Sequence, residues 1–582
     1  MSIIKELESN LKDYIKKAGY DEENIILTES NRKDLGDYQL NDAMKLAKIY
    51  HESPVAIANK IMDQLKDCEY LEDLNIAGPG FINFRLSEKY LLDALNRQNE
   101  SIYENIDMPE SKNIVLDYGG PNVAKALHVG HLRSANIGQG LKNLAKTLGY
   151  NVISDVHLGD YGRPLGLVIL EIKKRYPDLK FFDESYKGDY KEVELPITNK
   201  DLEQLYPIAS QKSKEDEEYL EEAREITTKM QRHERGYYDI WQRIIEISKN
   251  DVKKIYEELN INFELWEGES DAAEFIPELL TKFEQNNLIE ESNGAKIVNV
   301  KTEEDNSPMP PLLLVKSNDS VSYETTDLAA ILERQEKFNP DEIWYCVDNR
   351  QKLHFDQVFR AAHLAHLVNN DTKLEFVGFG TMNGKDGKPF KTRDGGVLKL
   401  NDLIELVTTE TEKRISSNID SETERMEIAR QVAISSLKYT DLLPYRETDY
   451  VFEIEKFADM EGKTGPYLLY STMRMKSLLR KSLTDKYEDS KVLTSNTEKD
   501  IVLTLLRLPI ILEKSLNNKS LNDIAEYLYK LTSLYNKFYS ENKVLTEEDS
   551  VKKSSWLTLT KVVYETNTML LNILGIKVPD KM

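Results

Sequence analysis

The sequence predicts a chain of three parts, in which an α/β domain with a parallel sheet lies between a small α+β domain and an all-α helical bundle. Three observations support this prediction. Residues 1–105 combine helical periodicity with a short alternating strand, residues 110–410 alternate short apolar strands with helices, and residues 420–582 repeat apolar residues at helical spacing. A length of 582 residues allows about three or four domains of ordinary size.

Composition excludes several classes of protein. Hydrophobic residues make up 40% of the chain and charged residues 31%, which is typical of a soluble globular protein and not of a collagen-like, disordered or membrane protein. No apolar run approaches the roughly 18 residues of a membrane span, and the N-terminus lacks the apolar core and cleavage site of a signal peptide. We therefore expect a cytoplasmic protein that does not bind membranes.

Charge and cysteine content limit the possible partners. The chain has 77 basic and 101 acidic residues, so its net charge of −24 opposes general attraction to nucleic acid. Any RNA contact must use local basic faces such as Arg474, Lys476, Arg480 and Lys481, although such a cluster is also common on a solvated helix. The two cysteines are far apart and form no CxxC motif, which supports neither a disulfide framework nor a thiolate metal site.

The α+β prediction rests on the first 105 residues. Apolar residues between Ile3 and Ile15 recur near a period of 3.6, which predicts an amphipathic helix. Further along, the Gly-Pro-Gly of residues 78–80 is expected to interrupt a helix and to begin a short strand in "FINFRL".

The α/β prediction begins near residue 112. "NIVLDY" has the pattern of a short apolar strand, "GGPN" that of a turn, and the following segment that of a helix closed by Gly149 before the strand "NVISDVHLG". The crossover in such a β-α-β unit implies a parallel sheet. "KIVNV", "LLLVKS", "EIWYCVD" and "LEFVGFG" supply more short strands, and residues 213–259 interrupt them as a long, charge-rich helix. After Leu400 strand signals vanish, and we expect four or more packed helices.

Two histidines stand three residues apart in "GGPNVAKALHVGHLRSANIGQG", and three roles are open for them. Such a pair is most often structural and satisfied by hydrogen bonds. A zinc site would need further ligands, and neither HExxH, CxxC nor a His-rich tract lies nearby. The third role is ligand binding, because a turn after the first strand of a parallel sheet opens onto the ligand side and the next helix offers unpaired N–H groups to a phosphate. Gly130, between His128 and His131, would let a flat or bulky group approach the backbone.

The run "DYGGPNVAKALHVGHLRSANIG" resembles the HIGH signature of class I aminoacyl-tRNA synthetases, and with "PNVAK" ahead of "HVGH" it is similar to the arginyl-tRNA synthetase family. Further segments resemble that family in the same order along nearly the whole chain. They are "GDYQLNDAMKLAK", "AGPGFINFRL", "HLGDYG", "SYETTDLAAI", "VDNRQKLHFDQVF", "GKPFKTRDGG", "KYTDLL", "DMEGKTGPYLLYSTMRMKSLLRK" and "NILGIKVPDKM".

The resemblance implies a fold and an activity. The fold is a Rossmann-like catalytic domain over residues 110–410 with a helical insertion, an N-terminal tRNA-binding domain for the tRNA elbow, and a C-terminal bundle for the anticodon. The activity is that of an arginine-tRNA ligase, which activates L-arginine with ATP to arginyl-adenylate and pyrophosphate and then transfers arginine to the terminal adenosine of tRNA(Arg). The resemblance also implies that Mg²⁺ accompanies ATP, that the protein binds no metal of its own, and that it is a monomer.

For ATP, the resemblance implies catalytic roles for Lys125, His128, His131 and Lys391, with Gly130 and Arg393 also in the ATP site. The sequence departs from the family's second ATP motif, KMSKS, and has "PFKTRDGG" in its place. Lys125, just ahead of HVGH, is similar to the lysine thought to compensate for this loss. On its own, the segment with Lys391 and Arg393 would be interpreted as a basic surface hairpin.

For the amino acid, the resemblance implies contacts by six residues: Asp117, Asn122, His128, Tyr323, Asp327 and Gln351. A guanidinium group has five donors in a fixed fork, so it favours carboxylates and rejects the point charge of lysine as a substitute. Each residue has an ordinary alternative: Asp117 could cap a turn, Tyr323 and Asp327 could pair on a helix face, and Gln351 could be a surface amide.

For the anticodon, the bundle offers aromatic and basic side chains that suit stacking and phosphate binding: Tyr467, Tyr470, Arg474, Tyr529, Lys537 and Tyr539. Aromatic residues in a bundle are more often core residues. The sequence departs from the family at "VKKSSWLTLTKVVYETNTML", where family members usually carry more arginine.

Overall fold

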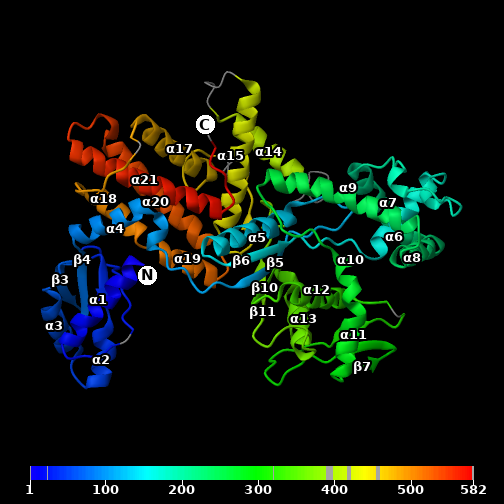
Figure 1. Ribbon diagram of the computed structural model, residues 1–582, viewed down its shortest axis with the longest axis horizontal. Coiled ribbons are helices and arrows are strands. Elements are labelled where there is room, and N and C mark those ends of the chain that lie inside the picture. Colours follow the sequence, from blue (N-terminus) through cyan, green and yellow to red (C-terminus); the bar gives the residue numbers. More distant parts are fainter. Residues whose placement is uncertain are drawn as a thin grey trace.

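The computed structural model describes residues 2–22, 24–318, 320–388, 398–415, 421–453, 459–484 and 486–579. Figure 1 shows the N-terminal domain (blue) below the C-terminal helices (orange to red), with the parallel sheet near the centre. A cluster of helices (cyan to green) extends from the sheet to one side, and a second lobe with α11, α12 and α13 lies below it.

The N-terminal domain is an antiparallel sheet packed against helices. Its sheet has the order β1-β2-β4-β3, with bounds β1 (Thr28–Glu29), β2 (Tyr38–Leu40), β3 (Leu71–Ala77) and β4 (Phe81–Leu86). Its helices are α1 (Ile3–Lys17), α2 (Asp42–Tyr50), α3 (Pro54–Leu65) and α4 (Glu88–Glu100), followed by the 3₁₀ turn η1 (Ile102–Asn105). The predicted first helix is confirmed as α1, whose apolar residues are buried.

The expectation of a helix before Gly78 was wrong, because residues 71–77 form strand β3. The ladder between β3 and β4 shifts register between Glu72 and Asn75, and Asp73 lies in the left-handed region with φ of 53°. This irregularity breaks the strict alternation by which a strand is recognised in a sequence.

The central sheet is parallel, as predicted, with the order β11-β10-β5-β6. Its strands are β5 (Asn113–Tyr118), β6 (Asn151–Asp155), β10 (Glu342–Asp348) and β11 (Lys373–Phe379). The helices beside it are α5 (Val129–Thr147), α12 (Tyr323–Phe338) and α13 (Lys352–Leu364), and the short η5 (Asn349–Gln351) follows β10. Strand order reverses between β5 and β10, and α/β proteins bind ligands at the carboxyl ends of the strands beside such a reversal.

Two of the four further predicted strands belong to a different sheet. "KIVNV" and "LLLVKS" give β8 (Ala295–Val298) and β9 (Leu312–Val315), which form an antiparallel sheet with β7 (Ile289–Ser292). Asn293 and Gly294, with φ of 50° and 78°, make the tight turn between β7 and β8. Asn-Gly is the preferred pair for such a hairpin, but the hairpin was not predicted from this signal. This sheet lies in the lower lobe with α11 (Ile276–Gln285).

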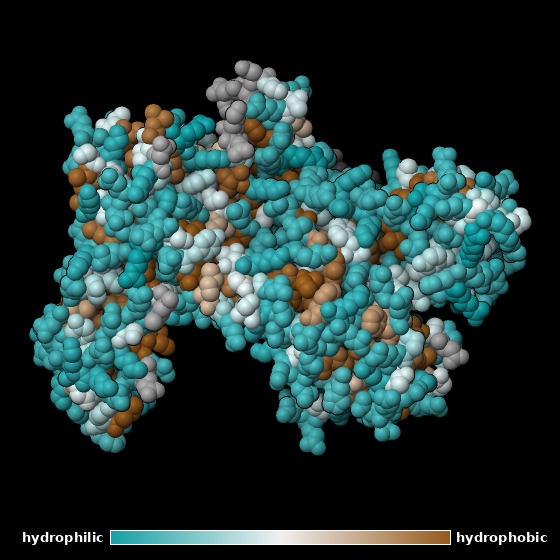
Figure 2. Space-filling view, viewed as in Figure 1, coloured by the Kyte–Doolittle hydropathy of each residue, from teal (hydrophilic) through white to brown (hydrophobic). Residues whose placement is uncertain are grey.

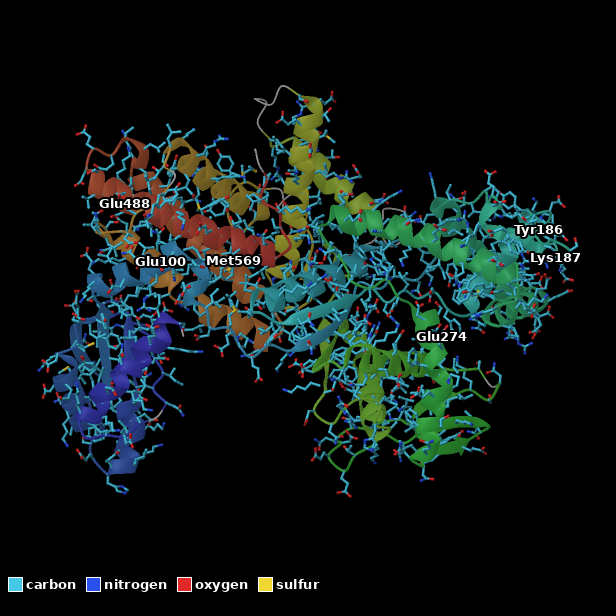
Figure 3. All side chains as sticks on the ribbon, in the orientation of Figure 1. Glu100, Tyr186, Lys187, Glu274, Glu488 and Met569 are labelled. Atoms are coloured by element: carbon cyan, nitrogen blue, oxygen red, sulfur yellow. The ribbon has the colours of Figure 1, made fainter. Side chains whose placement is uncertain are left out.

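The helical insertion contains four helices: α6 (Arg163–Arg175), α7 (Asn199–Glu215), α8 (Glu217–Gln231) and α9 (Tyr237–Glu258). Short turns η2 (Lys180–Phe182) and η3 (Tyr190–Glu192) lie between α6 and α7, and Tyr186 and Lys187 mark the outer end of the insertion (Figure 3). The single long helix expected over residues 213–259 was wrong. Asp216 caps the start of α8, and Gly236 at φ of 86° precedes α9, so the chain turns twice.

The C-terminal part is a set of packed helices, as predicted. They are α14 (Leu400–Glu412), α15 (Glu422–Leu442), α17 (Gly465–Lys481), α18 (Asn496–Leu505), α19 (Leu508–Asn517), α20 (Asn522–Glu541) and α21 (Ser550–Ile573), with the turn η6 (Val544–Thr546). The expectation of no strand after Leu400 was wrong, because β13 (Tyr450–Val451) pairs with β12 (Met382–Asn383). Two residues are too few to show a periodicity.

The N-terminal domain and the C-terminal helices are in direct contact. Asn99, near the Glu100 end of α4, accepts a hydrogen bond from Lys561 of α21 and donates one to the Tyr487 backbone (Figure 3). Both cysteines are buried and unpaired. The face in Figure 2 is mainly hydrophilic, and none of the helices described is long and apolar enough to cross a membrane.

Candidate active site

His128 and His131 form a compact pair where α5 begins. His128 is the N-cap residue, and its Nδ1 atom accepts the backbone N–H of Gly130 at 3.1 Å. The Nδ1 atom of His131 accepts the backbone N–H of His128 at 3.0 Å. The two rings lie 3.9 Å apart between centroids. The pair therefore performs the reciprocal capping that Ser and Glu perform at other helices, and it fixes both rings.

Both imidazoles are neutral. Burial, followed by the charge of Lys125, lowers the pKa of His128. Burial, the neighbouring His128 and Lys125 lower the pKa of His131 to about 3. Because a backbone N–H donates to each Nδ1, each neutral ring carries its proton on Nε2. We call His128, His131 and the start of α5 the HVGH corner. This corner offers two fixed N–H donors beside the N-terminus of α5, which is a suitable arrangement for a phosphate group.

Lys125 and Gly130 complete this corner. The Nζ atom of Lys125 lies 4.6 Å from the ring centre of Tyr206 on α7. The charge of Lys125 contributes to the lowered pKa of both histidines. A side chain at Gly130 would place its Cβ 2.9 Å from Cε1 of His128. Gly130 therefore makes room for the His128 ring itself.

Lys391 and Arg393 lie outside the described residues. The chain resumes at Leu398, whose carbonyl accepts the N–H of Val129, while the N–H of Leu400 donates to the carbonyl of Leu127. These bonds attach the residues that follow the "PFKTRDGG" segment directly to the HVGH segment.

A buried cluster lies at the carboxyl ends of β5 and β6. Asp117 and Asp155 are direct neighbours in the two strands, and the Nη2 atom of Arg334 lies 2.7 Å from the first and 2.9 Å from the second. Nδ1 of His157 lies 3.4 Å from Asp155. Burial alone would lower the pKa of His157, but its hydrogen bond to Asp155 raises that pKa to about 9.

This cluster has the composition of a metal site. One ligand atom from each of Asp117, Asp155 and His157 lies within 4.8 Å of the others. However, the guanidinium of Arg334 is hydrogen-bonded to both carboxylates, so the position between them holds a protein cation. The residues therefore do not fit a metal ion there.

A second acidic group lies on and beside α12. Nε2 of His354 is 2.5 Å from Oδ2 of Asp327. The carboxyl of Glu269, the first residue of α10 (Glu269–Ala272), has its pKa raised to about 7, first by burial and also by the charges of Asp327 and Asp160. Its position is set by the "HLGDYG" segment, because Glu269 donates its N–H to the carbonyl of Leu158.

The remaining predicted arginine contacts lie around these groups. Tyr323 begins α12, one turn before Asp327, and is 66% exposed. Gln351 is exposed in η5, just after β10. Asn122 pairs with Gly159 of "HLGDYG". Asp117 thus contacts Arg334 of α12, the helix that carries Asp327, and Asn122 pairs with the "HLGDYG" segment that also positions Glu269. Among the described residues, no hydrogen bond joins Tyr323 or Gln351 to these groups.

Known proteins share this chain's sequence and fold. Family models match in three consecutive ranges: the N-terminal domain of arginyl-tRNA synthetase over residues 5–86, the catalytic domain of class I tRNA synthetases (R) over residues 91–454, and the DALR anticodon binding domain over residues 468–582. An arginine–tRNA ligase from Alkaliphilus oremlandii is 43% identical, with 100% of both chains covered. One from Agathobacter rectalis is 41% identical over 97% of each chain.

The chain belongs to the arginyl-tRNA synthetase family.

Solved structures agree with this membership. The arginyl-tRNA synthetase of Plasmodium falciparum matches with a TM-score of 0.81 at 27% identity, with 100% of both chains covered. That of Thermus thermophilus matches in fold with a TM-score of 0.76 at 20% identity, over 99% of this chain and 100% of the other. As a member of this family the chain is a class I aminoacyl-tRNA synthetase and an arginine–tRNA ligase, with ATP as a substrate.

Several groups that shape the candidate site of this arginyl-tRNA synthetase were not predicted from its sequence. They are Asp155, His157, Glu269, Arg334 and His354. The segment "WEGES" carried a signal for Glu269, because a glycine followed by an acid is typical of a helix N-terminus.

In the bundle of this synthetase, three predicted anticodon residues line one cavity of about 900 Å³. The guanidinium of Arg474 lies 5.0 Å from the ring of Tyr470 and 5.2 Å from that of Tyr539. Tyr467 and Tyr529 lie elsewhere, with rings 5.7 Å apart, and the hydroxyl of Tyr467 accepts a hydrogen bond from Asn536. Lys537 is exposed and does not line this cavity.

Proposed function

We propose that the HVGH corner stabilises the transition state of arginine activation. In that step the carboxylate of arginine attacks the α-phosphate of ATP, and pyrophosphate leaves. The observation that supports this role is the fixation of both histidines through Nδ1, which leaves two preorganised Nε2–H donors beside the start of α5. Such donors stabilise negative charge that develops on phosphate oxygens without any reorganisation.

Cations neutralise the rest of the phosphate charge in this proposal. Lys125 is near enough to affect the titration of both histidines, which supports its place beside ATP. Lys391 and Arg393 are proposed as further phosphate ligands, because the chain that follows them is hydrogen-bonded to Leu127 and Val129. We propose that Mg²⁺ arrives as the partner of the ATP phosphates and that the enzyme holds no metal of its own.

We propose that arginine is recognised by acids at both of its cationic ends. Glu269 and Asp327, whose charge raises the pKa of Glu269, would receive the guanidinium group, with Tyr323 covering it. Asp117, Asn122 and Gln351 would receive the α-ammonium and carboxylate groups. Two carboxylates can meet the fork of a guanidinium, whereas lysine offers only a point charge and is disfavoured.

We propose that residues 1–105 contact the elbow of tRNA(Arg), that residues 110–410 carry out catalysis, and that residues 420–582 bind the anticodon. The cavity with Tyr470, Arg474 and Tyr539 supports the last part, because aromatic rings and a guanidinium can stack on unpaired bases. Further cations line the same cavity, including Lys476, Arg480 and Lys481. We also propose a cytoplasmic monomer.

The test is aminoacylation of a tRNA(Arg) transcript with ATP and each standard amino acid in turn. We expect charging with arginine alone. A His131→Ala variant should lose about 100-fold or more in kcat for ATP–pyrophosphate exchange with tRNA present. His366→Asn is the matched control, because His366 is exposed, lies outside the site and has φ of 53°, which Asn tolerates. Equal activity of the two variants would contradict the role of the HVGH corner.

A further inference from the structure

Arg334 is a buried cation beside the proposed active site, and the proposed chemistry gives it no role. It belongs to α12 and follows Tyr323 by eleven residues and Asp327 by seven, so all three project from one stripe of the helix. Two of these residues serve the proposed arginine pocket. Arg334 is buried at the other end of the stripe, with 2% of its side chain exposed.

The contacts of Arg334 are explained by strand geometry. Asp117 and Asp155 are paired across β5 and β6, where two like charges face each other on adjacent strands. Such a pair is destabilising unless a cation lies between them. The Nη2 atom of Arg334 donates to one oxygen of each, at 2.7 Å and 2.9 Å. Its guanidinium also lies 5.3 Å from the ring centre of Tyr345 on β10, so three adjacent strands meet at this one group.

The contact leaves part of Asp117 available. Only Oδ2 of Asp117 is bonded to Arg334, and its Oδ1 makes no hydrogen bond within the part of the chain that the structure describes. The side chain of Asp117 is 12% exposed, whereas that of Asp155 is 1% exposed. Asp117 therefore has one oxygen bonded to Arg334 and one that is left for another donor.

L-arginine poses a particular difficulty for a pocket with acids at both ends. The molecule carries a cation at each end, an α-ammonium group and a guanidinium group, so it could enter in either direction. Without Arg334, the adjacent carboxylates of Asp117 and Asp155 would be a second receptor for the guanidinium end. A reversed substrate would have its carboxylate away from the α-phosphate of ATP, and no adenylate could form.

We propose that Arg334 is a positioning residue that sets the direction of the bound substrate. Its guanidinium fills the receptor formed by Asp117 and Asp155, so the substrate's own guanidinium is excluded there and is directed to Asp327 and Glu269. The same contact favours the ionised form of Asp117, which burial opposes, and leaves one of its oxygens for the α-ammonium group. This inference rests on the proposed arginine pocket.

The test is steady-state kinetics of ATP–pyrophosphate exchange in the presence of tRNA, with the wild-type enzyme as the reference. For Arg334→Ala we expect the KM for arginine to rise about 10- to 100-fold, as for loss of a hydrogen bond to a charged group. We also expect excess arginine to inhibit the variant, because the vacated receptor admits the reversed substrate. Millimolar guanidinium chloride should restore part of the activity and relieve this inhibition, whereas sodium chloride at equal ionic strength should not.

Two results would overturn the proposal. One is a folded Arg334→Ala enzyme whose KM for arginine is within twofold of the wild-type value. The other is an identical response to guanidinium and sodium chloride, since a merely structural role predicts no specific rescue. Failure of the wild-type enzyme to charge arginine would instead contradict its proposed pocket and function, so the two failures are distinguishable.

Arg334→Ala removes the cation between two buried carboxylates, and their repulsion can prevent the variant from folding. A second variant therefore tests the proposal without removing this charge. Arg334→Lys keeps the charge and loses the fork, and we expect its KM for arginine to rise about tenfold with a smaller change in kcat. Arg360→Lys is the matched control, because Arg360 makes a two-pronged contact with Asp305 at 2.7 Å and 2.8 Å away from the pocket. Equal KM values for the two lysine variants would overturn the proposal.

Discussion

The Nε atom of Arg133 lies 3.0 Å from the carboxylate of Asp441, and both side chains are fully buried. Arg133 belongs to α5, which begins with the HVGH histidines, and Asp441 belongs to α15 of the C-terminal helices. Arg133 also donates to the carbonyls of Gly380 and Thr448. A buried ion pair therefore joins the helix that begins with the HVGH histidines to α15, and both residues lie in the range that the class I catalytic family matches.

Loss of this pair should be costly. Asp441→Asn leaves the charge of Arg133 buried without a counter-ion, so we expect the free energy of unfolding to fall by about 3 kcal/mol, measured as a shift of the urea midpoint. Glu221→Gln is the control, since Glu221 and Arg224 form an exposed pair at 2.9 Å. That variant should lose less than about 1 kcal/mol. Similar losses in both variants would show that the buried pair is unimportant.

The affinity for arginine should depend on pH through Glu269. Its pKa is raised to about 7, mainly by burial, and the ionised form is the one that attracts a guanidinium. We expect the KM for arginine to fall as pH rises from about 6 to about 8. In Glu269→Gln the KM should be high and should lose this pH dependence. An unchanged profile in the variant would assign the titration to another group.

Glu269 should also reduce stability at neutral pH. Its folded pKa lies above its unfolded value, so the folded state binds more protons and the free energy of unfolding falls as pH rises from about 4.5 to about 7. Glu269→Gln should therefore be more stable than the wild type at pH 8, by about 1 to 3 kcal/mol, while it is less active. Thermal unfolding of both proteins at pH 5 and pH 8 measures this difference, which should be small at the lower pH.

The sequence predicted those parts of the site that are local in the chain. The strand, turn and helix around HVGH, and the helical spacing of Tyr323 and Asp327, follow from short-range periodicity. Strand β7 was missed because three of its four residues are exposed and show no apolar alternation, although Asn293 and Gly294 marked the turn that follows it.

The groups that were missed depend on contacts between distant residues. Arg334 is 217 residues from Asp117 and 179 from Asp155, and no periodicity relates them. Its position requires the strand register that pairs the two acids, which a single sequence does not contain. The raised pKa of Glu269 likewise depends on burial and on the charge of Asp327. In the sequence alone, an acid at the start of a helix is an ordinary helix-start signal.

The cavity in the bundle predicts a selective defect in tRNA binding. Arg474 lies between Tyr470 and Tyr539, so Arg474→Ala removes a cation and loosens both rings. We expect the KM for tRNA to rise about tenfold and the KM for arginine at saturating tRNA to stay within twofold. Arg243→Ala, which removes an exposed arginine of the insertion paired with Glu246, should leave both values unchanged. Equal changes in both KM values would indicate a general loss of structure.

The final prediction concerns Gly130, for which two explanations are possible. If the glycine makes room for the His128 ring, Gly130→Ala should displace that ring, because the new Cβ would lie 2.9 Å from Cε1. We expect kcat for ATP–pyrophosphate exchange to fall about tenfold with no loss of stability, since Ala is favoured over Gly in a helix. In a His128→Ala background the same substitution should have almost no further effect, because the ring is already absent. If Gly130 instead admits ATP to the backbone, the substitution should slow both backgrounds equally, so a double-mutant cycle on His128 and Gly130 decides between the two explanations.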